Sequence, residues 1–376
     1  MARILLVTSR WPWPPWRGNQ VRTVQWAEAL RDHSLAIVAP GGEDAPEGAP
    51  EMLVHRSPVP ARAVGLLSAV ARGRPLQEGL YAPADARRAV RTALACEPWD
   101  LVVIQVVRTA WVADEVRRAR HGAALLFDAV DSMGLHFGRR SRLWAPEARR
   151  CARLEARLAR RASITTAVTE RDLEAIGPPV ERGRVVPVWV PSRPRLAEPA
   201  RPVVLLSGNL GYRPTVEGAM RFAEEVWPEV RSRVPAATWR LVGARPSRRI
   251  RRLGRLEGVE LRGEVPDLGP HLDEAAVAIA PMVGGSGVPM KVLSAWGGGV
   301  PVVAGEPAAA SFPADERRAL AVARDPAEWV EHLVRLLSDA TAAADLAERG
   351  RLAWAARYSP ERVGHAIREA VTSALC

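Results

Sequence analysis

The stretch APMVGGSGVPMKVLSAWGGGVPVVAG, residues 280–305, holds the end of one strand, a glycine-rich loop, a helix and a second strand. The apolar run at 277–282 predicts the first strand, residues 288–299 predict the helix, and residues 300–305 predict the second strand. Strands that alternate with helices in this way are typical of a parallel sheet. The stretch therefore indicates an α/β fold.

The loop inside this stretch is suited to hold an anion. Its glycines allow backbone N–H groups to approach a ligand closely, and the start of the helix adds partial positive charge and unpaired N–H donors. Lys291 lies in the first turn of the expected helix and adds a full charge. A glycine-rich turn without a ligand would give a similar pattern, so both interpretations remain open at this point.

The same alternation occurs on both sides of a proline-rich segment. Strands are expected at 2–9, 34–40, 99–106, 123–131 and 164–169, and again at 203–209, 238–244, 259–265, 277–282 and 300–305. Helices are expected at 19–33, 145–163, 215–234, 288–299, 327–357 and 359–375. Two doubly wound, Rossmann-like domains that face each other across a cleft follow from this order, with ligands at the carboxyl ends of the strands.

The expected organisation has four parts. These are an N-terminal domain at 1–190, a linker at 191–202, a C-terminal domain at 203–357 and a final helix at 358–376 that packs back on the first domain. A length of 376 residues with 48% hydrophobic and 25% charged residues agrees with two globular domains.

Composition narrows the classes of partner and compartment. The formal net charge is +11, almost all of the positive charge being arginine, yet no nucleic-acid-binding motif occurs, so nucleic acid is not an expected partner. Three scattered cysteines and histidines without metal-ligand spacing predict no disulfide framework, no bound metal and a cytoplasmic location. No apolar run is long enough to cross a bilayer, which leaves only a peripheral contact with the inner face of a membrane open, for example through the arginine-rich residues 147–161.

Residues 285–305, GSGVPMKVLSAWGGGVPVVAG, resemble the donor-site segment of retaining GT-B glycosyltransferases of family 4, which in many members reads GTGxxxKxLEAMAxGxPVVA. The residues at 208–246, those at 258–282 and the opening RWPWPPWRGNQVRTVQWAEALRDH at 10–33 are also similar to this family. The resemblance implies a GT-B fold and transfer of a hexosyl or deoxysugar group from a nucleotide-diphosphate donor to a hydroxyl group, with retention at the anomeric carbon. It also implies that the domain at 1–190 lies on the acceptor side and that the domain at 203–357 binds the nucleotide-sugar donor.

The resemblance also implies roles for individual residues. On the donor side, Gly208, Asn209 and Arg213 follow a strand and bind the donor, and Gly263, Glu264 and Val265 contact its nucleobase. The diphosphate is bound by Ser286, Gly287, Val288 and Lys291, and the ribose by Ser294. Near the reaction centre the implied residues are Gly18, Asp131 and Lys291. On the acceptor side they are Trp13, Trp16, Arg22 and Asp128. Plain turn glycines, surface arginines and helix-capping aspartates are the alternatives at Gly18, Arg22, Asp128 and Asp131.

Two departures from the family pattern affect the donor site. Many members carry an arginine and a lysine where this chain has Asn209 and Thr215, and Arg213 between them is a candidate substitute. The family's ribose-binding glutamate is replaced by Ser294. Three explanations stay open: a deoxyribose donor such as a dTDP-sugar rather than a UDP-sugar, a ribose held less tightly at a cost of about 1–3 kcal/mol, or a non-catalytic relative.

The expected function is therefore metal-independent sugar transfer with no cofactor besides the nucleotide-sugar co-substrate. The acceptor is a hydroxylated small molecule, a lipid or a glycan, in natural-product or envelope biosynthesis. A non-hydrolysing sugar-nucleotide epimerase and a catalytically silent GT-B partner protein are the rival functions. Trp26, Trp227, Trp329 and Trp354 lie in apolar helical patterns and are expected in the core, unlike Trp13 and Trp16.

Overall fold

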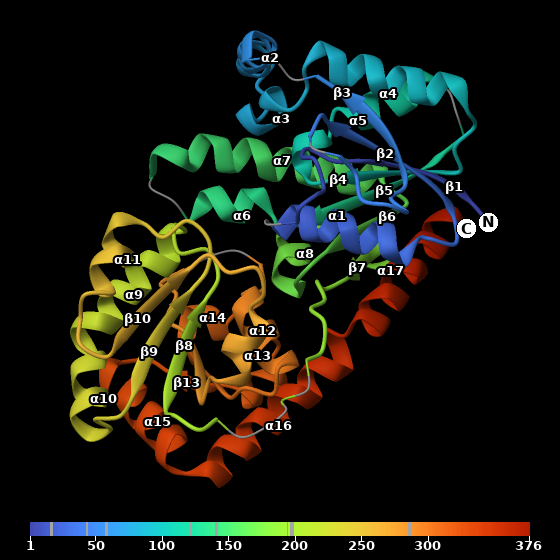
Figure 1. Ribbon diagram of the computed structural model, residues 1–376. Helices are drawn as coiled ribbons and strands as arrows, with labels where there is room; N and C mark the ends of the chain where they lie inside the picture. Colours follow the sequence, from blue (N-terminus) through green and yellow to red (C-terminus); the bar gives the residue numbers. More distant parts are fainter. Residues whose placement is uncertain are drawn as a thin grey trace. The chain divides into compact units, whose positions relative to one another are not determined.

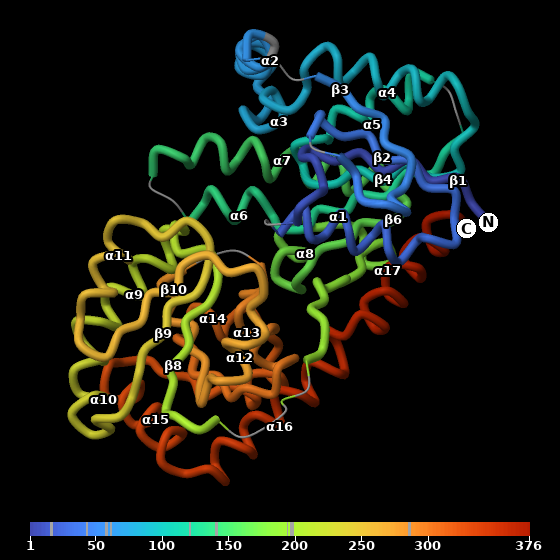
Figure 2. Tube along the Cα trace, viewed as in Figure 1, coloured from blue at the N-terminus to red at the C-terminus, as the bar shows by residue number. Residues whose placement is uncertain are grey.

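The computed structural model describes residues 1–15, 18–42, 44–56, 59–119, 122–139, 142–193, 195, 199–284 and 287–376. They form two compact units, each with its own parallel sheet (Figures 1 and 2). The first unit comprises Met1–Val188 and Val363–Cys376, and the second comprises Trp189–Arg362. Two parallel α/β domains confirm the fold class that the alternating pattern predicts.

The described residues of the first unit form a seven-stranded sheet in the order β3-β2-β1-β4-β5-β6-β7, and all neighbouring strands are parallel. Its strands are β1 (Arg3–Val7), β2 (Ser34–Pro40), β3 (Glu51–His55), β4 (Leu101–Gln105), β5 (Ala124–Val130), β6 (Ile164–Ala167) and β7 (Gly183–Val185). Its helices are α1 (Gly18–Ala29), α2 (Val59–Ala71), α3 (Leu76–Leu80), α4 (Ala84–Cys96), α5 (Val112–Ala119), α6 (Met133–Gly138), α7 (Ala145–Arg161) and α8 (Glu170–Ile176). The strand order reverses between β1 and β4, and doubly wound sheets bind ligands at the carboxyl ends of the strands beside such a point.

The described residues of the second unit form a six-stranded parallel sheet in the order β10-β9-β8-β11-β12-β13, with its reversal between β8 and β11. Its strands are β8 (Val203–Ser207), β9 (Thr238–Val242), β10 (Val259–Gly263), β11 (Val277–Ala280), β12 (Val302–Gly305) and β13 (Ala321–Ala323). Its helices are α9 (Arg213–Glu225), α10 (Trp227–Arg233), α11 (Arg248–Leu253), α12 (Gly269–Asp273), α13 (Met290–Gly297), α14 (Glu306–Ala309), α15 (Pro326–Ser338) and α16 (Ala340–Arg357). Helix α17 (Pro360–Leu375) begins in the second unit and ends in the first.

Two expected helices are each divided in the structure. The helix predicted at 215–234 becomes α9 and α10, because Val226 leaves the helical conformation with φ of −121° and Pro228 occupies the second position of α10. The pattern at 327–357 becomes α15 and α16. Asp339 ends the first of these and caps the second, its side chain accepting a hydrogen bond from the backbone N–H of Ala342.

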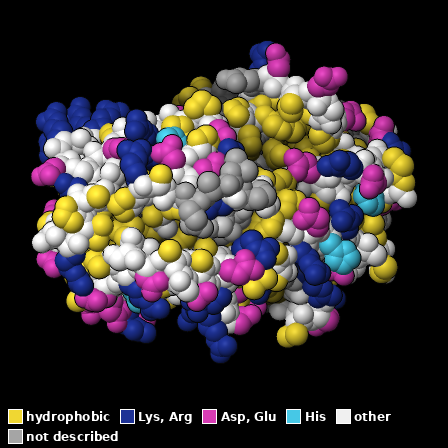
Figure 3. Space-filling view, turned by 60° about the horizontal axis from the view of Figure 1, so that its bottom comes forward, with side chains coloured by type: hydrophobic (Ala, Val, Ile, Leu, Met, Phe, Trp, Pro, Cys, Tyr) yellow, Lys and Arg dark blue, Asp and Glu magenta, His cyan; other side chains and the backbone are white. Residues whose placement is uncertain are grey.

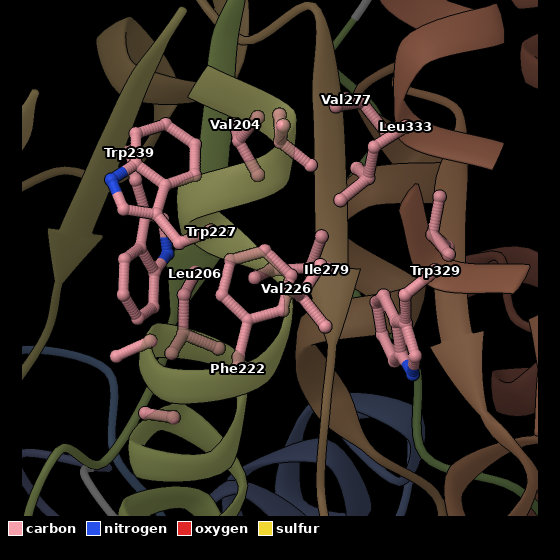
Figure 4. Close-up of a cluster of buried hydrophobic side chains, with 14 of the residues drawn as sticks. Val204, Leu206, Phe222, Val226, Trp227, Trp239, Val277, Ile279, Trp329 and Leu333 are labelled. Carbon is pink, nitrogen blue, oxygen red and sulfur yellow. The ribbon is translucent and has the colours of Figure 1, made fainter. Parts of the chain in front are cut away.

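The core of the second unit is built around an aromatic cluster between its sheet and α9, α10 and α15 (Figure 4). The Phe222 ring contacts Trp227, Trp239 and Trp329, with ring centroids 4.8 Å apart for the Phe222–Trp239 pair. The predicted core positions of Trp26, Trp227, Trp329 and Trp354 are confirmed, since all four side chains are buried. On the face in Figure 3, by contrast, basic and acidic side chains are interspersed over much of the surface.

Replacement of Trp239 by alanine should destabilise the second unit. The Trp239 side chain is fully buried against Phe222 and Trp227, so its loss leaves a cavity, and we expect the free energy of unfolding to fall by about 3–5 kcal/mol. Urea unfolding followed by circular dichroism measures the change. The control is Leu352→Ala in α16, where the side chain is 54% exposed and the change should stay within about 0.5 kcal/mol. Equal effects of the two substitutions would contradict this account of the core.

Candidate functional site

The glycine-rich loop leads from β11 to α13, as expected. Gly287 has φ of +70°, a backbone conformation that favours glycine, and α13 begins at Met290 directly after Pro289. Ser286 lies outside the described residues, so its predicted contact with the diphosphate stays a prediction. Val288, also predicted there, is half-buried.

Lys291 is the single lysine of the sequence and lies in the first turn of α13. Its Nζ atom donates a hydrogen bond to the Met282 sulfur at 3.4 Å. A Cβ atom built on Gly208, at the end of β8, would lie 3.8 Å from this Nζ atom. The structure therefore brings together Gly208 and Lys291, two of the predicted donor-site residues, at the carboxyl ends of β8 and β11 where the strand order reverses.

The charge of Lys291 is not neutralised by the protein. Among the described residues no carboxylate lies within ion-pair distance of its Nζ atom, and burial lowers its pKa to about 8. The buried Arg240 of the same unit differs, because it pairs with both Glu260 and Glu274. An ammonium group without a counter-charge at the end of a sheet is suited to bind an anion.

Close backbone packing places the neighbouring strand ends beside this lysine. Gly208, Gly243 and Gly263 follow or end β8, β9 and β10 with φ of +116°, +146° and +70°. A Cβ atom on Gly243 would overlap the Gly208 carbonyl oxygen, and the Gly243 N–H donates to the Gly263 carbonyl oxygen at 2.6 Å. The sequence analysis named Gly208 and Gly263 as site residues but not Gly243, although Gly243 lies in the segment 208–246 that resembles the family.

The remaining predicted donor residues are less closely grouped. Asn209 accepts a hydrogen bond from the backbone N–H of Gly211, while Arg213 is 86% exposed and pairs with Glu217 one turn along α9. Glu264 is exposed and Val265 half-buried in the loop after β10. Ser294 is half-buried on α13, one turn after Lys291. Nothing in these contacts places Arg213 beside Lys291.

In the first unit, Arg22 and Asp128 form a fully buried ion pair. Their closest atoms, Nη2 and Oδ1, are 2.9 Å apart. Arg22 also donates to the Pro187 carbonyl oxygen, and Asp128 accepts hydrogen bonds from Gln105 and Thr166. This network joins α1 to the carboxyl ends of β4, β5 and β6 and uses the hydrogen-bonding groups of both residues inside the unit. The acceptor contact that we expected for Arg22 and Asp128 stays a prediction.

Two strand ends in the first unit carry an unusual backbone. Val106 and Val130, which follow or end β4 and β5, have φ of +64° and +62°. This conformation is unfavourable for a β-branched residue and is found most often at functional sites. Asp131, predicted near the reaction centre, comes directly after Val130 and is half-buried with interaction partners of its own. Sequence patterns gave no indication of either valine.

A buried carboxylate, that of Glu155 in α7, holds the residues that follow Asp131. Glu155 accepts hydrogen bonds from the backbone N–H groups of Met133 and Gly134 and from the Ser132 hydroxyl group. Burial raises its pKa to about 7, although these hydrogen bonds act in the opposite direction. Glu155 therefore anchors the first turn of α6.

The other expected residues of the first unit are placed as follows. Trp13 lines a cavity of about 420 Å³ with α1 and residues 46–50, and its ring packs edge-on against Trp11. Trp16 lies outside the described residues. Gly18 begins α1 and is exposed, and a Cβ atom there would meet nothing within 4 Å. No steric constraint therefore requires glycine at this position.

The described parts of the chain contain no candidate metal site and no candidate membrane-spanning helix. No group of three or more His, Cys, Asp or Glu side chains is arranged to hold a metal ion. None of the helices described is both long and apolar enough to span a membrane.

Comparison with known proteins places this geometry in context. A model of the family "Glycosyl transferases group 1" matches residues 201–339, the part that contains β8, α13 and Lys291. No curated protein matches the sequence. Among solved structures, sucrose-phosphate synthase from Thermosynechococcus elongatus is similar, with 15% identity, a TM-score of 0.75 and coverage of 99% of this chain and 98% of that one.

Two further structures show the same fold over the full length. HepE from Anabaena, solved in complex with UDP and glucose, has 16% identity and a TM-score of 0.70, and the match covers 99% of this chain and 100% of that one. The α,α-trehalose 6-phosphate synthase from Burkholderia multivorans has 14% identity and a TM-score of 0.68, with both chains fully covered. These findings confirm the prediction of a GT-B glycosyltransferase, an enzyme that transfers sugars. The chain has the GT-B fold, and its residues 201–339 match the model of the family Glycosyl transferases group 1.

Proposed function

We propose that the protein transfers a sugar from a nucleotide-diphosphate donor to a hydroxyl group of the acceptor, with retention at the anomeric carbon. One observation carries the proposal: the uncompensated Lys291 ammonium group lies beside Gly208, at the carboxyl ends of β8 and β11 and in the first turn of α13. A diphosphate supplies the negative charge that this position lacks.

The chemistry follows from where charge develops. When the bond between the sugar and the diphosphate breaks, negative charge grows on the leaving phosphate oxygen. A fixed cation and the N–H groups of a helix start stabilise that charge without reorganising. Retention is consistent with delivery of the acceptor hydroxyl on the face that the diphosphate leaves, a phosphate oxygen accepting its proton. This route uses neither a carboxylate nucleophile nor a metal ion, and we propose that the reaction proceeds in the presence of a chelator.

The donor is proposed to carry deoxyribose, as in a dTDP-sugar, with a UDP-sugar as the alternative. Ser294 lies one turn beyond Lys291, where related enzymes present a carboxylate to the ribose hydroxyls. A serine hydroxyl group is small and offers one contact where a carboxylate offers two. A donor without a 2′-hydroxyl group loses nothing at such a position.

The acceptor is proposed to be a hydroxylated natural product, envelope glycan or lipid. The Trp13 ring, which lines a cavity beside α1, is the described aromatic surface suited to an apolar part of such an acceptor. A catalytically silent binding protein is the rival function, and the substitution at Ser294 is the observation in its favour. Transfer or donor hydrolysis by the purified protein decides between them.

Substitution of Lys291 by methionine tests the donor site. We expect weaker binding of UDP and dTDP, and a transfer rate lower by about a hundredfold to a thousandfold, because one preorganised charge is lost from the leaving-group site. Calorimetry and product analysis measure the two effects. The melting temperature should stay unchanged or rise at neutral pH, because the folded protein holds this lysine at a pKa below that of the unfolded chain. Undiminished nucleotide binding by Lys291→Met would rule out the proposed site, and Arg88→Gln, at an 80% exposed position of the first unit, is the control.

The pH dependence of nucleotide binding follows from the same group. Lys291 titrates near pH 8 in the free protein, and a bound diphosphate should raise this pKa, so binding takes up a proton between the two values. The affinity for UDP should therefore be greatest below about pH 8 and should fall as the pH rises above it. Because Lys291 is the single lysine, reductive methylation with isotope-labelled formaldehyde marks only this side chain and the α-amino group for NMR titration. A lysine signal that titrates at the same pH with and without UDP would contradict the prediction.

The pentose preference is tested with UDP and dUDP, which differ only in the 2′-hydroxyl group. The unmodified protein should bind dUDP and dTDP at least as tightly as UDP. Ser294→Glu restores a carboxylate acceptor and should improve UDP binding relative to dUDP binding by about tenfold or more. Calorimetric titrations with the three nucleotides give the ratios. Binding of UDP ten times tighter than dTDP by the unmodified protein would show that the deoxyribose proposal is wrong.

A further inference from the structure

Arg10 is a second cation without a counter-charge, and it lies in the first unit. It follows β1 and is half-buried. Its Nη2 group donates to the Tyr81 hydroxyl oxygen at 3.4 Å, and its buried Nε group has no hydrogen-bond partner. Among the described residues no carboxylate lies within ion-pair distance of Arg10.

Other buried or half-buried arginines of this unit show the usual arrangement. Arg22 pairs with Asp128, Arg74 pairs with Glu78 and Asp114, and Arg87 pairs with Glu115. Each carboxylate offsets the free energy that the guanidinium group loses on leaving water. Arg10 lacks this compensation, so its environment is incomplete without an anion.

A second guanidinium group, that of Arg108, contacts the ring of Tyr81. The Cζ atom of Arg108, which follows β4, is 5.2 Å from the centroid of the Tyr81 ring, and its Nε group donates to the Gln77 side chain. Burial lowers the pKa of Arg10, the Tyr81 hydroxyl group raises it, and the like charge of Arg108 lowers it further. Arg10 and Arg108 thus follow β1 and β4, the two strands between which the sheet order reverses.

Unpaired polar atoms occur close to Arg10 in the sequence. Ser9 Oγ, Arg10 Nε, Trp11 Nε1 and Asn19 Nδ2 are all buried and have no hydrogen-bond partner among the described residues. Ser9 is only 4% exposed. Buried polar atoms are normally paired, so four unpaired ones within residues 9–19 indicate a missing ligand or ordered water.

We propose that Arg10, with Arg108 and the Tyr81 hydroxyl group, binds an oxyanion, a phosphate monoester or a carboxylate, carried by the acceptor. As an acceptor site it rests on the proposed function, since the donor site lies in the other unit. Guanidinium groups bind phosphate and carboxylate oxygens with paired N–H donors. The acceptor is then an anionic hydroxyl compound rather than a neutral one.

The test uses the full chain carrying Lys291→Met, in which the donor-site cation is absent. Thermal unfolding is measured with increasing inorganic phosphate, and separately with acetate, at constant ionic strength maintained with chloride. We expect a rise in melting temperature with at least one of the two ions. The tighter ion identifies the acceptor group as a phosphate ester or a carboxylate.

Arg10→Gln in the same background should weaken this binding by at least about tenfold, the loss expected for a charged hydrogen bond. The ligand-free melting temperature should stay the same or rise, because the substitution removes an uncompensated charge, whereas a purely structural arginine would lower it. Arg88→Gln, which removes an exposed arginine of the same unit, should leave ion binding unchanged. Absence of binding in the parent, or equal weakening by Arg10→Gln and Arg88→Gln, would overturn the proposal. UDP binding by the unmodified protein is measured separately, so failure of the donor site and failure of the Arg10 site are distinguishable.

Discussion

Compensation of buried positive charge is the constraint on which both units depend. A guanidinium or ammonium group removed from water must regain its lost solvation from a carboxylate or another acceptor. Arg22 and Arg240 meet this requirement inside the protein, with Asp128 in the first unit and with two glutamates in the second. Lys291 and Arg10 do not, and both lie beside the point where the strand order of their own sheet reverses. Lys291 and Arg10 therefore lie at positions where such sheets bind ligands.

The two units reach this result by different means. In the second unit the strand ends are packed backbone against backbone, since a Cβ atom on Gly243 would overlap the Gly208 carbonyl oxygen. In the first unit the strand ends are held by side chains, through the network of Arg22, Asp128, Gln105 and Thr166. The glycines bring neighbouring strand ends of the second unit into close contact, whereas the side chains fix a specific set of polar groups in the first unit.

The sequence predicted those features whose signal is local. The α/β order, the loop before α13 and Lys291 in its first turn follow from short apolar runs, glycine spacing and resemblance to a family. Strand β3 and helix α2 were not predicted. The strand EMLVH is short, and the helix VPARAVGLLSAVA has few polar residues to mark a solvent-facing side. The Arg22–Asp128 pair joins residues 106 positions apart, so no local pattern reveals it. Charge compensation depends on such distant partners, and for this reason Arg10 became noticeable only in the folded chain.

The path of the chain between the units has a consequence for its synthesis. Helix α17 starts in the second unit and ends in the first, where the Arg368 side chain donates to the Ala29 carbonyl oxygen and Val363, Ile367 and Val371 are buried. Residues 363–376 leave the ribosome after all of the second unit. The first unit therefore begins to fold first and receives its final helical segment last, so the second unit has the opportunity to complete its folding earlier, although it comes later in the sequence.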